Sequence, residues 1–280
     1  DVVVMCMGIS PKLEGEQGAS ANSDGGGDRL SLDLPGMQEA LLKAIHATGK
    51  PIVLVLLNGS PLTINWAQKH IPAIIEAWYP GEEGGTAVAD VIFGNYNPGG
   101  RLPVTFVKSM DQLPDFEDYR MENRTYRYMK DTPLYPFGYG LSYTKFSYTN
   151  FTLDRYQFDT AEDVQINVAV NVTNDGDRMG DEVVQLYVSD VEASVTVPRW
   201  ELRGFKRITL KPGETVTVQF TLTKRQLALI DNDGKCVLEP GKFMIYVGGQ
   251  QPDARSTELT GQEVLKQELL VTGERVELDY

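Results

Sequence analysis

The hydrophobic pattern of this chain changes its period near residue 146. From Asp1 to about Phe106, unbroken apolar runs such as "PIVLVLLNG" alternate with segments whose apolar residues fall at helical spacing. Unbroken runs are typical of parallel strands that are buried on both faces under helices. After Phe146, apolar and polar residues alternate, as in "VQINVAVNVTN", and turn sequences such as "KPGE" separate the runs. The sequence therefore predicts two different folds in succession.

We expect an α/β domain with a mainly parallel sheet at 1–108, an ordered connector at 109–145 and an all-β domain at 146–280. In the first domain, Leu34–Ile45 is predicted to form a helix with Pro35 in its first turn. The last domain holds roughly seven short strands, which favours an antiparallel β-sandwich. The connector is too rich in Pro, Gly and Tyr for regular structure.

Composition narrows the choice of partners. The 280 residues are 41% hydrophobic, enough for two ordinary cores, and the formal net charge is -13. Such a charge argues against nucleic acid or an anionic membrane, because phosphates would be repelled. Cys6 and Cys236 each lie in an apolar run, so we expect two buried thiols and no disulfide.

The ends of the chain and its apolar runs carry no sign of a membrane segment. No stretch approaches the roughly 20 apolar residues of a membrane helix. The opening "DVVVMCMG" lacks the basic and apolar regions of a signal peptide, so we expect the chain to begin inside a domain. Export is not indicated by this sequence, although a periplasmic or secreted location would be compatible with it.

A Gly-rich loop with two carboxylates, Glu14 and Glu16, follows the first apolar run. Open α/β sheets bind ligands beyond the carboxyl ends of their strands, so this loop leaves the sheet where chemistry is expected. Taken alone, "EGE" is more often a solvated pair of surface carboxylates. The functional interpretation depends on the rest of the chain.

Other chemistries receive little support. His46 and His70 lie in predicted helices without Cys or carboxylate at metal-ligand spacing, so neither a zinc site nor a Ser-His triad is predicted. The stretches "GNYNPGG" and "GGGDR" lack both GxGxxG and a phosphate-loop Lys, and no cofactor or metal is expected. Glu82 and Glu83 precede a predicted helix, where carboxylates complement the N-terminus.

Three stretches carry a family resemblance: "EAWYPGEEGGTAVADVIFGNYNPGGRLPVTF", "PLYPFGYGLSYTKFSY" and "PRWELRGFKRITLKPGE". Together they resemble glycoside hydrolase family 3 over nearly the whole chain. In that family a (β/α)8 barrel supplies an Asp nucleophile, an α/β sandwich supplies a general acid/base Glu on a loop, and a fibronectin type III-like domain often ends the chain. The resemblance implies a partial α/β/α sandwich followed by that last domain, without the barrel and the first half of the sandwich.

The resemblance also implies roles for individual residues. Glu16, preceded by Gly15, would be the general acid/base, with Glu14 as the alternative. The family places this Glu a few residues before an Asp-Arg pair. Here the insertion "QGASANSDGG" separates it from Asp28 and Arg29, so the register is open. Asp28 and Arg29 are expected to orient the loop.

Aromatic and basic residues are candidates for contacts with a sugar. Arg124, Tyr126 and Arg127 in "NRTYRYM" are expected to help line the sugar-binding cleft. Trp78 and Tyr79 would either stack on a sugar ring or pack in the core, and core packing is the commoner role for aromatics at a strand end.

The function implied by the resemblance is part of a retaining, exo-acting β-glycosidase that removes β-linked glucose or xylose from oligosaccharide ends. Its partners would be the oligosaccharide substrate and the missing barrel and half-sandwich, and the chain alone is expected to be inactive because retaining hydrolysis needs two carboxyl groups. One alternative is a non-catalytic pair of modules that binds glycan or protein. A remoter one is a flavodoxin-like nucleotide-binding domain with an adhesion module.

Overall fold

The computed structural model describes residues 1–14 and 29–279. Backbone contacts divide the chain into two compact units, which are described separately below. The first comprises Asp1–Tyr96, Val104–Asn123 and Asp131–Tyr135, and the second comprises Asn97–Pro103, Arg124–Lys130 and Pro136–Tyr280. The domain boundaries expected at 108 and 145 stay a prediction.

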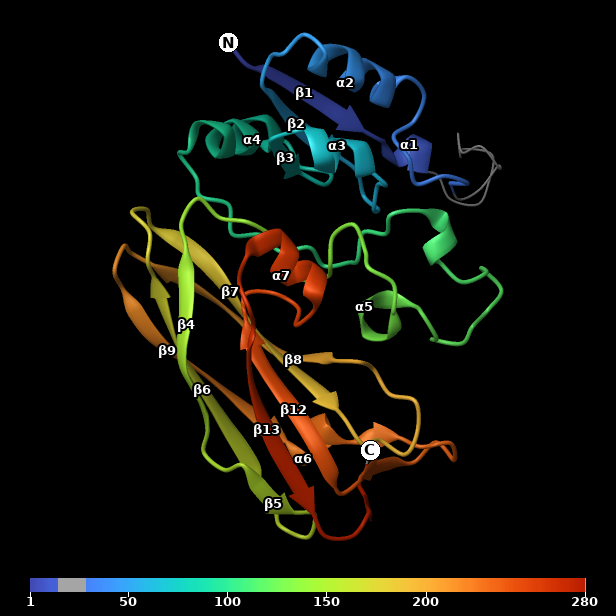
Figure 1. Ribbon diagram of the computed structural model, residues 1–280, viewed down its shortest axis with the longest axis vertical. Coiled ribbons are helices and arrows are strands. Elements are labelled where there is room, and N and C mark those ends of the chain that lie inside the picture. Colours follow the sequence, from blue (N-terminus) through green and yellow to red (C-terminus); the bar gives the residue numbers. More distant parts are fainter. Residues whose placement is uncertain (15–28, 280) are drawn as a thin grey trace. The chain divides into compact units, whose positions relative to one another are not determined.

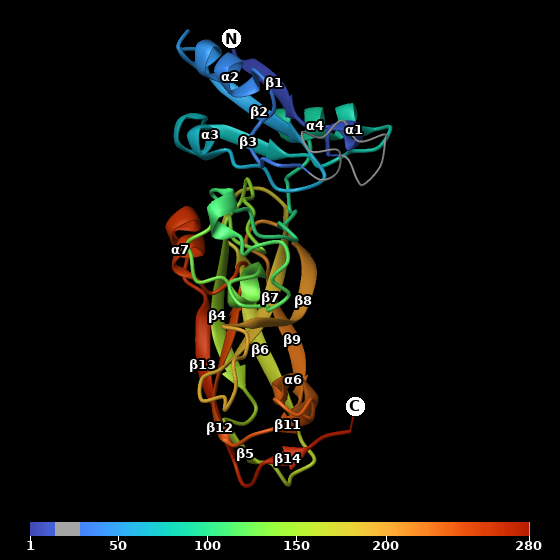
Figure 2. The same ribbon diagram turned by 90° about the vertical axis from the view of Figure 1, so that its right-hand side faces the viewer.

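The first unit is built on a parallel sheet. Over the described residues, its strands have the order β1-β2-β3, as expected for a mainly parallel α/β sheet. The strands are β1 (Val3–Gly8), β2 (Ile52–Leu57) and β3 (Ala73–Glu76), and the helical segments are α1 (Pro11–Glu14), α2 (Gln38–His46), α3 (Asn65–His70), α4 (Gly84–Phe93) and a 3₁₀ turn, η1 (Met110–Gln112). Figure 2 shows α2 and α3 on one side of this sheet and α4 on the other.

Burial differs between the central strand and the edge strand of this sheet. In β2, residues of both faces are buried, as the unbroken apolar run predicts. In β1, Met5 and Met7 are buried, whereas Val4 and Cys6 are exposed. The prediction that both thiols are buried is therefore wrong for Cys6 and correct for Cys236, which lies in β11. The physical reason is that successive side chains of a strand point to opposite faces. Met5 and Met7 point to the covered face of β1, whereas Val4 and Cys6 point to the other face, which is exposed.

The first long helix begins later than its apolar spacing predicts. α2 starts at Gln38, and Pro35 lies before it in a turn in which the carbonyl of Pro35 accepts the N–H of Gln38 at 3.4 Å. Gly36 between them has φ +60°, a left-handed conformation that a right-handed helix cannot include.

The end of β1 is fixed by the side chain of Gln38. Its Nε2 donates to the carbonyl of Gly8 and its Oε1 accepts the N–H of Gly8, both at 2.8 Å. Gly8 has φ +136°, and a Cβ there would lie 2.1 Å from the carbonyl oxygen of Leu57. Only glycine fits this position, where the chain leaves β1 toward α1.

The second unit is a β-sandwich. Over 136–279, one sheet has the order β5-β13-β12-β7-β8, a second has β4-β6-β9, and a small third has β10-β11-β14. The strands are β4 (Phe146–Leu153), β5 (Gln157–Asp159), β6 (Gln165–Asn174), β7 (Gly180–Asp190), β8 (Glu201–Leu210), β9 (Thr215–Thr223), β10 (Leu229–Ile230), β11 (Cys236–Leu238), β12 (Gly241–Gly248), β13 (Leu265–Thr272) and β14 (Val276–Glu277), and the helices of this unit are α5 (Thr125–Tyr128), α6 (Lys224–Leu227) and α7 (Ala254–Thr260) (Figure 1). The pairs are antiparallel as predicted, except that β5 runs parallel to β13.

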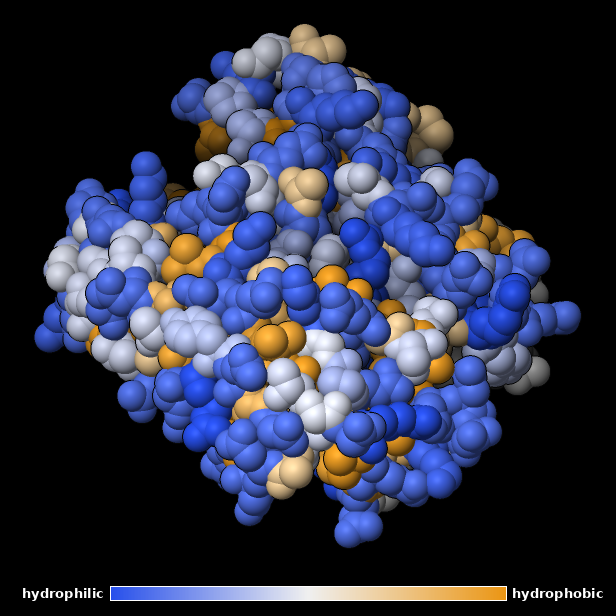
Figure 3. Space-filling model, turned by 60° about the horizontal axis from the view of Figure 1, so that its bottom comes forward, coloured by the Kyte–Doolittle hydropathy of each residue, from blue (hydrophilic) through white to orange (hydrophobic). Residues whose placement is uncertain are grey.

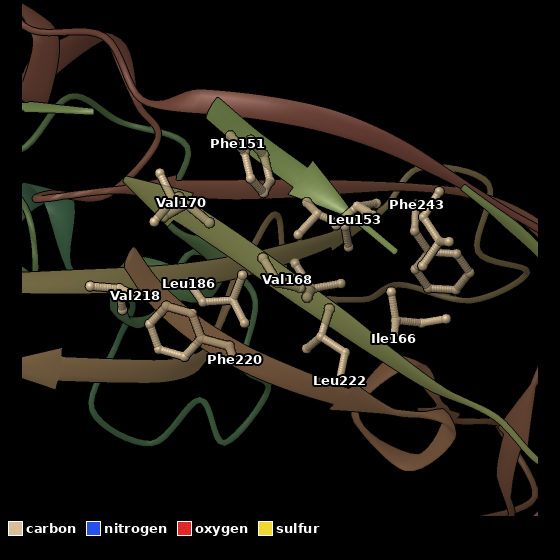
Figure 4. Packing of buried hydrophobic residues seen from close by; sticks show 14 of the residues in the cluster. Phe151, Leu153, Ile166, Val168, Val170, Leu186, Val218, Phe220, Leu222 and Phe243 are labelled. Carbon is tan, nitrogen blue, oxygen red and sulfur yellow. The ribbon is translucent and has the colours of Figure 1, made fainter. Parts of the chain in front are cut away.

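Alternating residues of the two larger sheets form the core of the sandwich. Val168 on β6, Leu222 on β9 and Phe243 on β12 are buried in one cluster, and Figure 4 shows such side chains from both sheets converging. The alternation read from the sequence is therefore confirmed as one face packed inward.

A buried ion pair and a side-chain hydrogen bond fasten two Gly-rich segments of this unit to β7. Arg101 Nη2 donates to both carboxylate oxygens of Glu182 at 3.1 Å, and the two side chains are only 9% and 5% exposed. Burial raises the pKa of Glu182, and Arg101 opposes that rise. Gly138, at φ +77°, accepts a hydrogen bond from the side chain of Gln185 at 3.0 Å and donates its own N–H to the carbonyl of Leu102 at 2.7 Å. The "PFGYG" stretch is thereby held against the sandwich.

One face of the molecule carries both hydrophilic and hydrophobic residues. On the face shown in Figure 3, hydrophobic residues form small separate patches between hydrophilic ones. Within the part of the chain that the structure describes, every helix is too short or too polar to cross a membrane.

Candidate active site

Three segments meet at the carboxyl edge of the parallel sheet. Glu14 ends α1, which Figure 1 shows directly beyond the arrowhead of β1. Ser60 follows β2, and Tyr79 follows β3. Parallel strands place their carboxyl ends at one edge, so residues 46 and 65 positions apart in the sequence come into contact.

Glu14 is held from both neighbouring strand ends. Its Oε1 accepts a hydrogen bond from Ser60 Oγ, and its Oε2 accepts one from the Tyr79 hydroxyl at 2.5 Å. Arg29 Nη2 donates to Ser60 Oγ at 2.9 Å and to the carbonyl of Pro61 at 3.0 Å. A Cβ at Gly59 would lie 2.6 Å from the ring of Tyr79 and 2.7 Å from Glu14 Oε2, so glycine lets the β2 loop approach this closely.

Burial and the charge of Glu14 shift the pKa values of Tyr79 and Arg29. Burial, the hydrogen bond to Glu14 and the charge of Glu14 together raise the pKa of Tyr79 to about 12. Burial lowers the pKa of Arg29 and the Glu14 carboxylate opposes that shift, yet a guanidinium stays charged at any physiological pH. Tyr79 and Arg29 therefore both keep their protons at physiological pH and act as hydrogen-bond donors.

A second carboxyl group, Glu76, ends β3 at the same edge. Its Oε1 accepts the N–H of Trp78 at 3.2 Å. Burial raises the pKa of Glu76 to about 7, against the opposing effects of the Asn58 side chain and the Trp78 N–H. Asn58 is fully buried, its Nδ2 donates to the carbonyl of Ser60 at 3.1 Å, and its Oδ1 accepts no hydrogen bond from any described residue. Glu76 thus titrates near neutral pH.

Sequence reasoning missed Glu76, Ser60 and Asn58. The available signal was a carboxylate as the last residue of an otherwise apolar strand, "AIIE". Trp78, for which sugar stacking and core packing were the two predicted roles, is half-buried with its ring edge-on to Phe106 at 6.0 Å. Its backbone has φ +54°, a conformation that an L-residue with a bulky side chain adopts only under constraint.

Only two of the four predicted loop residues lie in the part of the chain that the structure describes. Glu14 and Arg29 lie in the cluster, whereas Glu16 and Asp28 lie outside the described residues. The contacts of Arg29 with Ser60 and Pro61 are of the kind that would orient a loop, and that role stays a prediction.

The predicted sugar-contacting residues belong to the second unit. Arg124 precedes α5, in which the ring of Tyr126 stacks on Phe137 with centroids 4.2 Å apart. Arg127 forms an ion pair with Glu201. These contacts hold 124–130 against the sandwich, and the proposed contacts with sugar stay a prediction.

The remaining candidates are structural in character. Glu83 stands at the start of α4, as expected, and accepts a hydrogen bond from Thr86 Oγ1 at 3.0 Å. His70 stacks on Trp66 with ring centroids 4.5 Å apart, and His46 lies edge-on to both. Across residues 1–14 and 29–279, no three His, Cys, Asp or Glu side chains gather in a way that could hold a metal ion.

Comparison with known proteins assigns the class and then the family. The model of the glycosyl hydrolase family 3 C-terminal domain matches residues 1–143, and that of the fibronectin type III-like domain matches 182–251. The chain therefore belongs to glycosyl hydrolase family 3. This confirms the resemblance and the fold class read from the sequence.

Its relatives are larger proteins. The chain is 46% identical to a beta-xylosidase of Formosa agariphila over 267 residues, which are 93% of this chain and 35% of that protein. It is 40% identical to the periplasmic beta-glucosidase of Salmonella typhimurium over 89% of this chain and 32% of that protein. The solved structure of a β-glucosidase from Erythrobacter marinus superposes with a TM-score of 0.81 at 38% identity, covering 97% of this chain and 34% of that one. The chain thus spans about a third of the length of the relatives it matches.

Proposed function

We propose that this chain is the acid/base-bearing portion of a retaining, exo-acting β-glycosidase that removes terminal β-linked glucose or xylose from oligosaccharides. Relatives named beta-xylosidase and beta-glucosidase support this activity, and their greater length supports a barrel elsewhere in the longer protein. That barrel would supply the Asp nucleophile. Glu16 would be the general acid/base, with Glu14 as the alternative.

The chemistry requires two carboxyl groups about 5 Å apart. In the first step the barrel carboxylate attacks the anomeric carbon while Glu16 gives its proton to the departing glycosidic oxygen. This leaves a covalent glycosyl-enzyme and a Glu16 carboxylate. In the second step Glu16 takes a proton from water, whose oxygen attacks the anomeric carbon and releases the nucleophile. Glu16 is then protonated again.

One observation carries the proposal: the chain that leaves β1 toward Glu16 is tied at Glu14 to the ends of β2 and β3. A general acid must lie within hydrogen-bond reach of the oxygen that it protonates, and small errors in position are costly. A fixed start for this loop supports a task that depends on position.

The test is Glu16→Gln in the longer enzyme. Gln keeps the shape of the side chain but carries no transferable proton, so turnover of unactivated oligosaccharides should fall roughly 10²- to 10⁴-fold. Activated aryl glycosides should suffer less, because their leaving groups depart without protonation. Azide, which needs no general base, should restore turnover and yield a glycosyl azide of retained configuration.

Glu14→Gln is the matched comparison, because the two residues lie two positions apart. If Glu14→Gln alone shows the dependence on the leaving group and the rescue by azide, the assignment moves to Glu14. If neither variant shows them, the loop does not carry the acid/base, and a non-catalytic binding role gains support.

A further inference from the structure

The direction of the hydrogen bonds around Glu14 follows from the chemistry of its partners. A guanidinium has donors only, so the hydroxyl oxygen of Ser60 must accept the bond from Arg29. The proton of Ser60 is then directed at Glu14 Oε1. A carboxylate is the natural acceptor at the end of this relay from Arg29 through Ser60.

The other oxygen of Glu14 receives a second donor. The Tyr79 hydroxyl lies 2.5 Å from Oε2, and the pKa of about 12 keeps Tyr79 protonated throughout the working range. Both oxygens of Glu14 therefore accept hydrogen bonds from protein donors. A general acid must instead present a proton to the glycosidic oxygen, which this arrangement does not favour.

We infer that Tyr79 and Ser60 are positioning residues that hold Glu14 as an anionic anchor for the acid/base loop, and that Glu14 is not itself the proton donor. This inference rests on the proposed function. Glu14 is the last residue of α1 and lies two positions before Glu16 in the sequence. Fixing the Glu14 carboxylate between two strand ends thus restricts where the loop can begin.

Neighbouring residues fix the position of Tyr79. Trp78 before it has φ +54° and gives its N–H to Glu76, which turns the chain sharply after β3. Gly59 lets the β2 loop pass against the ring of Tyr79. The anchor is therefore built from three strand ends rather than from one flexible contact.

The test compares Tyr79→Phe, Glu14→Gln and their double variant in the longer enzyme. Tyr79→Phe removes only the hydroxyl. We expect kcat on unactivated oligosaccharides to fall roughly tenfold to a hundredfold with little change in KM, because a displaced acid/base group loses rate more than binding. The double variant should lose little more than either single one, because both changes remove the same hydrogen bond.

Two readouts separate positioning from catalysis. Azide should give no glycosyl azide in Tyr79→Phe or Glu14→Gln, because the acid/base carboxylate would still be present. Glu14→Gln should also shift the alkaline limb of kcat/KM to lower pH. Removing a negative charge near the acid/base makes that group easier to ionise, and the enzyme is active only while the group is protonated.

Tyr119→Phe is the matched control, since Tyr119 lies in the same unit and is 90% exposed. Activity of Tyr79→Phe equal to this control would overturn the inference, and so would a glycosyl azide from Glu14→Gln. If Tyr79→Phe lowers the yield of folded protein, Ser60→Ala interrupts the relay from Arg29 and should show the same loss of kcat without azide rescue. Failure of the proposed function is distinct: neither Glu16→Gln nor Glu14→Gln would then show the dependence on the leaving group or the rescue by azide, whatever Tyr79→Phe does.

Discussion

Glu76 should make the stability of the first unit depend on pH in the direction opposite to that of an ion-paired carboxylate. Its pKa is raised from 4.5 to about 7, mainly by burial. Between these two values the folded protein keeps a proton on Glu76 that the unfolded chain has lost. The free energy of unfolding therefore falls as the pH rises through this window and stays low above about pH 7.

The size of the effect follows from the same two values. One pKa step corresponds to roughly 1.4 kcal/mol, so the whole shift corresponds to roughly 3 kcal/mol, of which roughly 2–3 kcal/mol falls between pH 5 and pH 8. Glu76→Gln cannot ionise and removes this term. The difference in the free energy of unfolding between the variant and the native chain should therefore shift in favour of the variant by roughly 2–3 kcal/mol as the pH rises from 5 to 8. This corresponds to roughly 5–10 °C in the difference of their Tm values.

The assay is thermal unfolding of both proteins at pH 5, 6, 7 and 8, followed by near-ultraviolet circular dichroism of the tryptophans. Comparing variant and native protein at each pH cancels the titration of other groups. Glu82→Gln, at an exposed position in the loop after β3, is the control and should show a difference that does not change with pH. A Glu76→Gln difference that is equal at pH 5 and pH 8 would refute the reasoning.

Three further predictions address the rest of the chain. This chain alone should show no turnover of aryl β-glucosides or β-xylosides, because retaining hydrolysis needs two carboxyl groups and the nucleophile is proposed to lie in the barrel; measurable turnover would contradict that view. Glu182→Ala should lower the free energy of unfolding by about 3–5 kcal/mol, because Arg101 is then buried without its partner; an unchanged denaturation midpoint would argue against it. Cys6 should react with a thiol reagent in the folded chain, whereas Cys236 should react only on unfolding, and equal rates would contradict the burial described here.

The two-part architecture could be predicted because periodicity reports burial directly. Alternation in "VQINVAVNVTN" became β6, with its even-numbered residues packed inward. The unbroken run of β2 became the central strand of the parallel sheet. In β1 the same kind of run gave a different result, because an apolar residue such as Val4 does not reveal whether a helix covers it.

The start of α2 illustrates a competition between two local signals. Pro35 favours the first turn of a helix, and the predicted helix begins at Leu34. Gly36 instead adopts a left-handed conformation, and the side chain of Gln38 is occupied by the end of β1. The start of the helix therefore coincides with a glycine in a left-handed conformation and with a contact between residues 30 positions apart, and the latter is not visible in any local pattern.

The sequence predicted the carboxylate at the sheet edge but not the residues that contact it. The Gly-rich loop indicated where a carboxylate would lie, because strand ends in an α/β sheet are predictable places for ligands. Its partners were not visible, because Ser60 and Tyr79 reach Glu14 only through the order of the strands. Ser60 lies in no spacing motif, and Tyr79, although it lies in the "EAWYPG" stretch, was a candidate for sugar stacking or core packing and not for a contact with Glu14.

Two carboxylates two positions apart are ranked only weakly by the sequence, because the insertion before Asp28 and Arg29 leaves the register open. What separates them physically is the supply of donors. Glu14 ends a short helix and receives the hydroxyls of Ser60 and Tyr79 on its two oxygens, an environment that suits a fixed anion. A general acid needs the reverse, a carboxyl group whose proton is left for the substrate. The azide experiment on Glu14→Gln therefore tests the assignment where sequence reasoning was weakest, because only the loss of the true general base opens a route to the glycosyl azide.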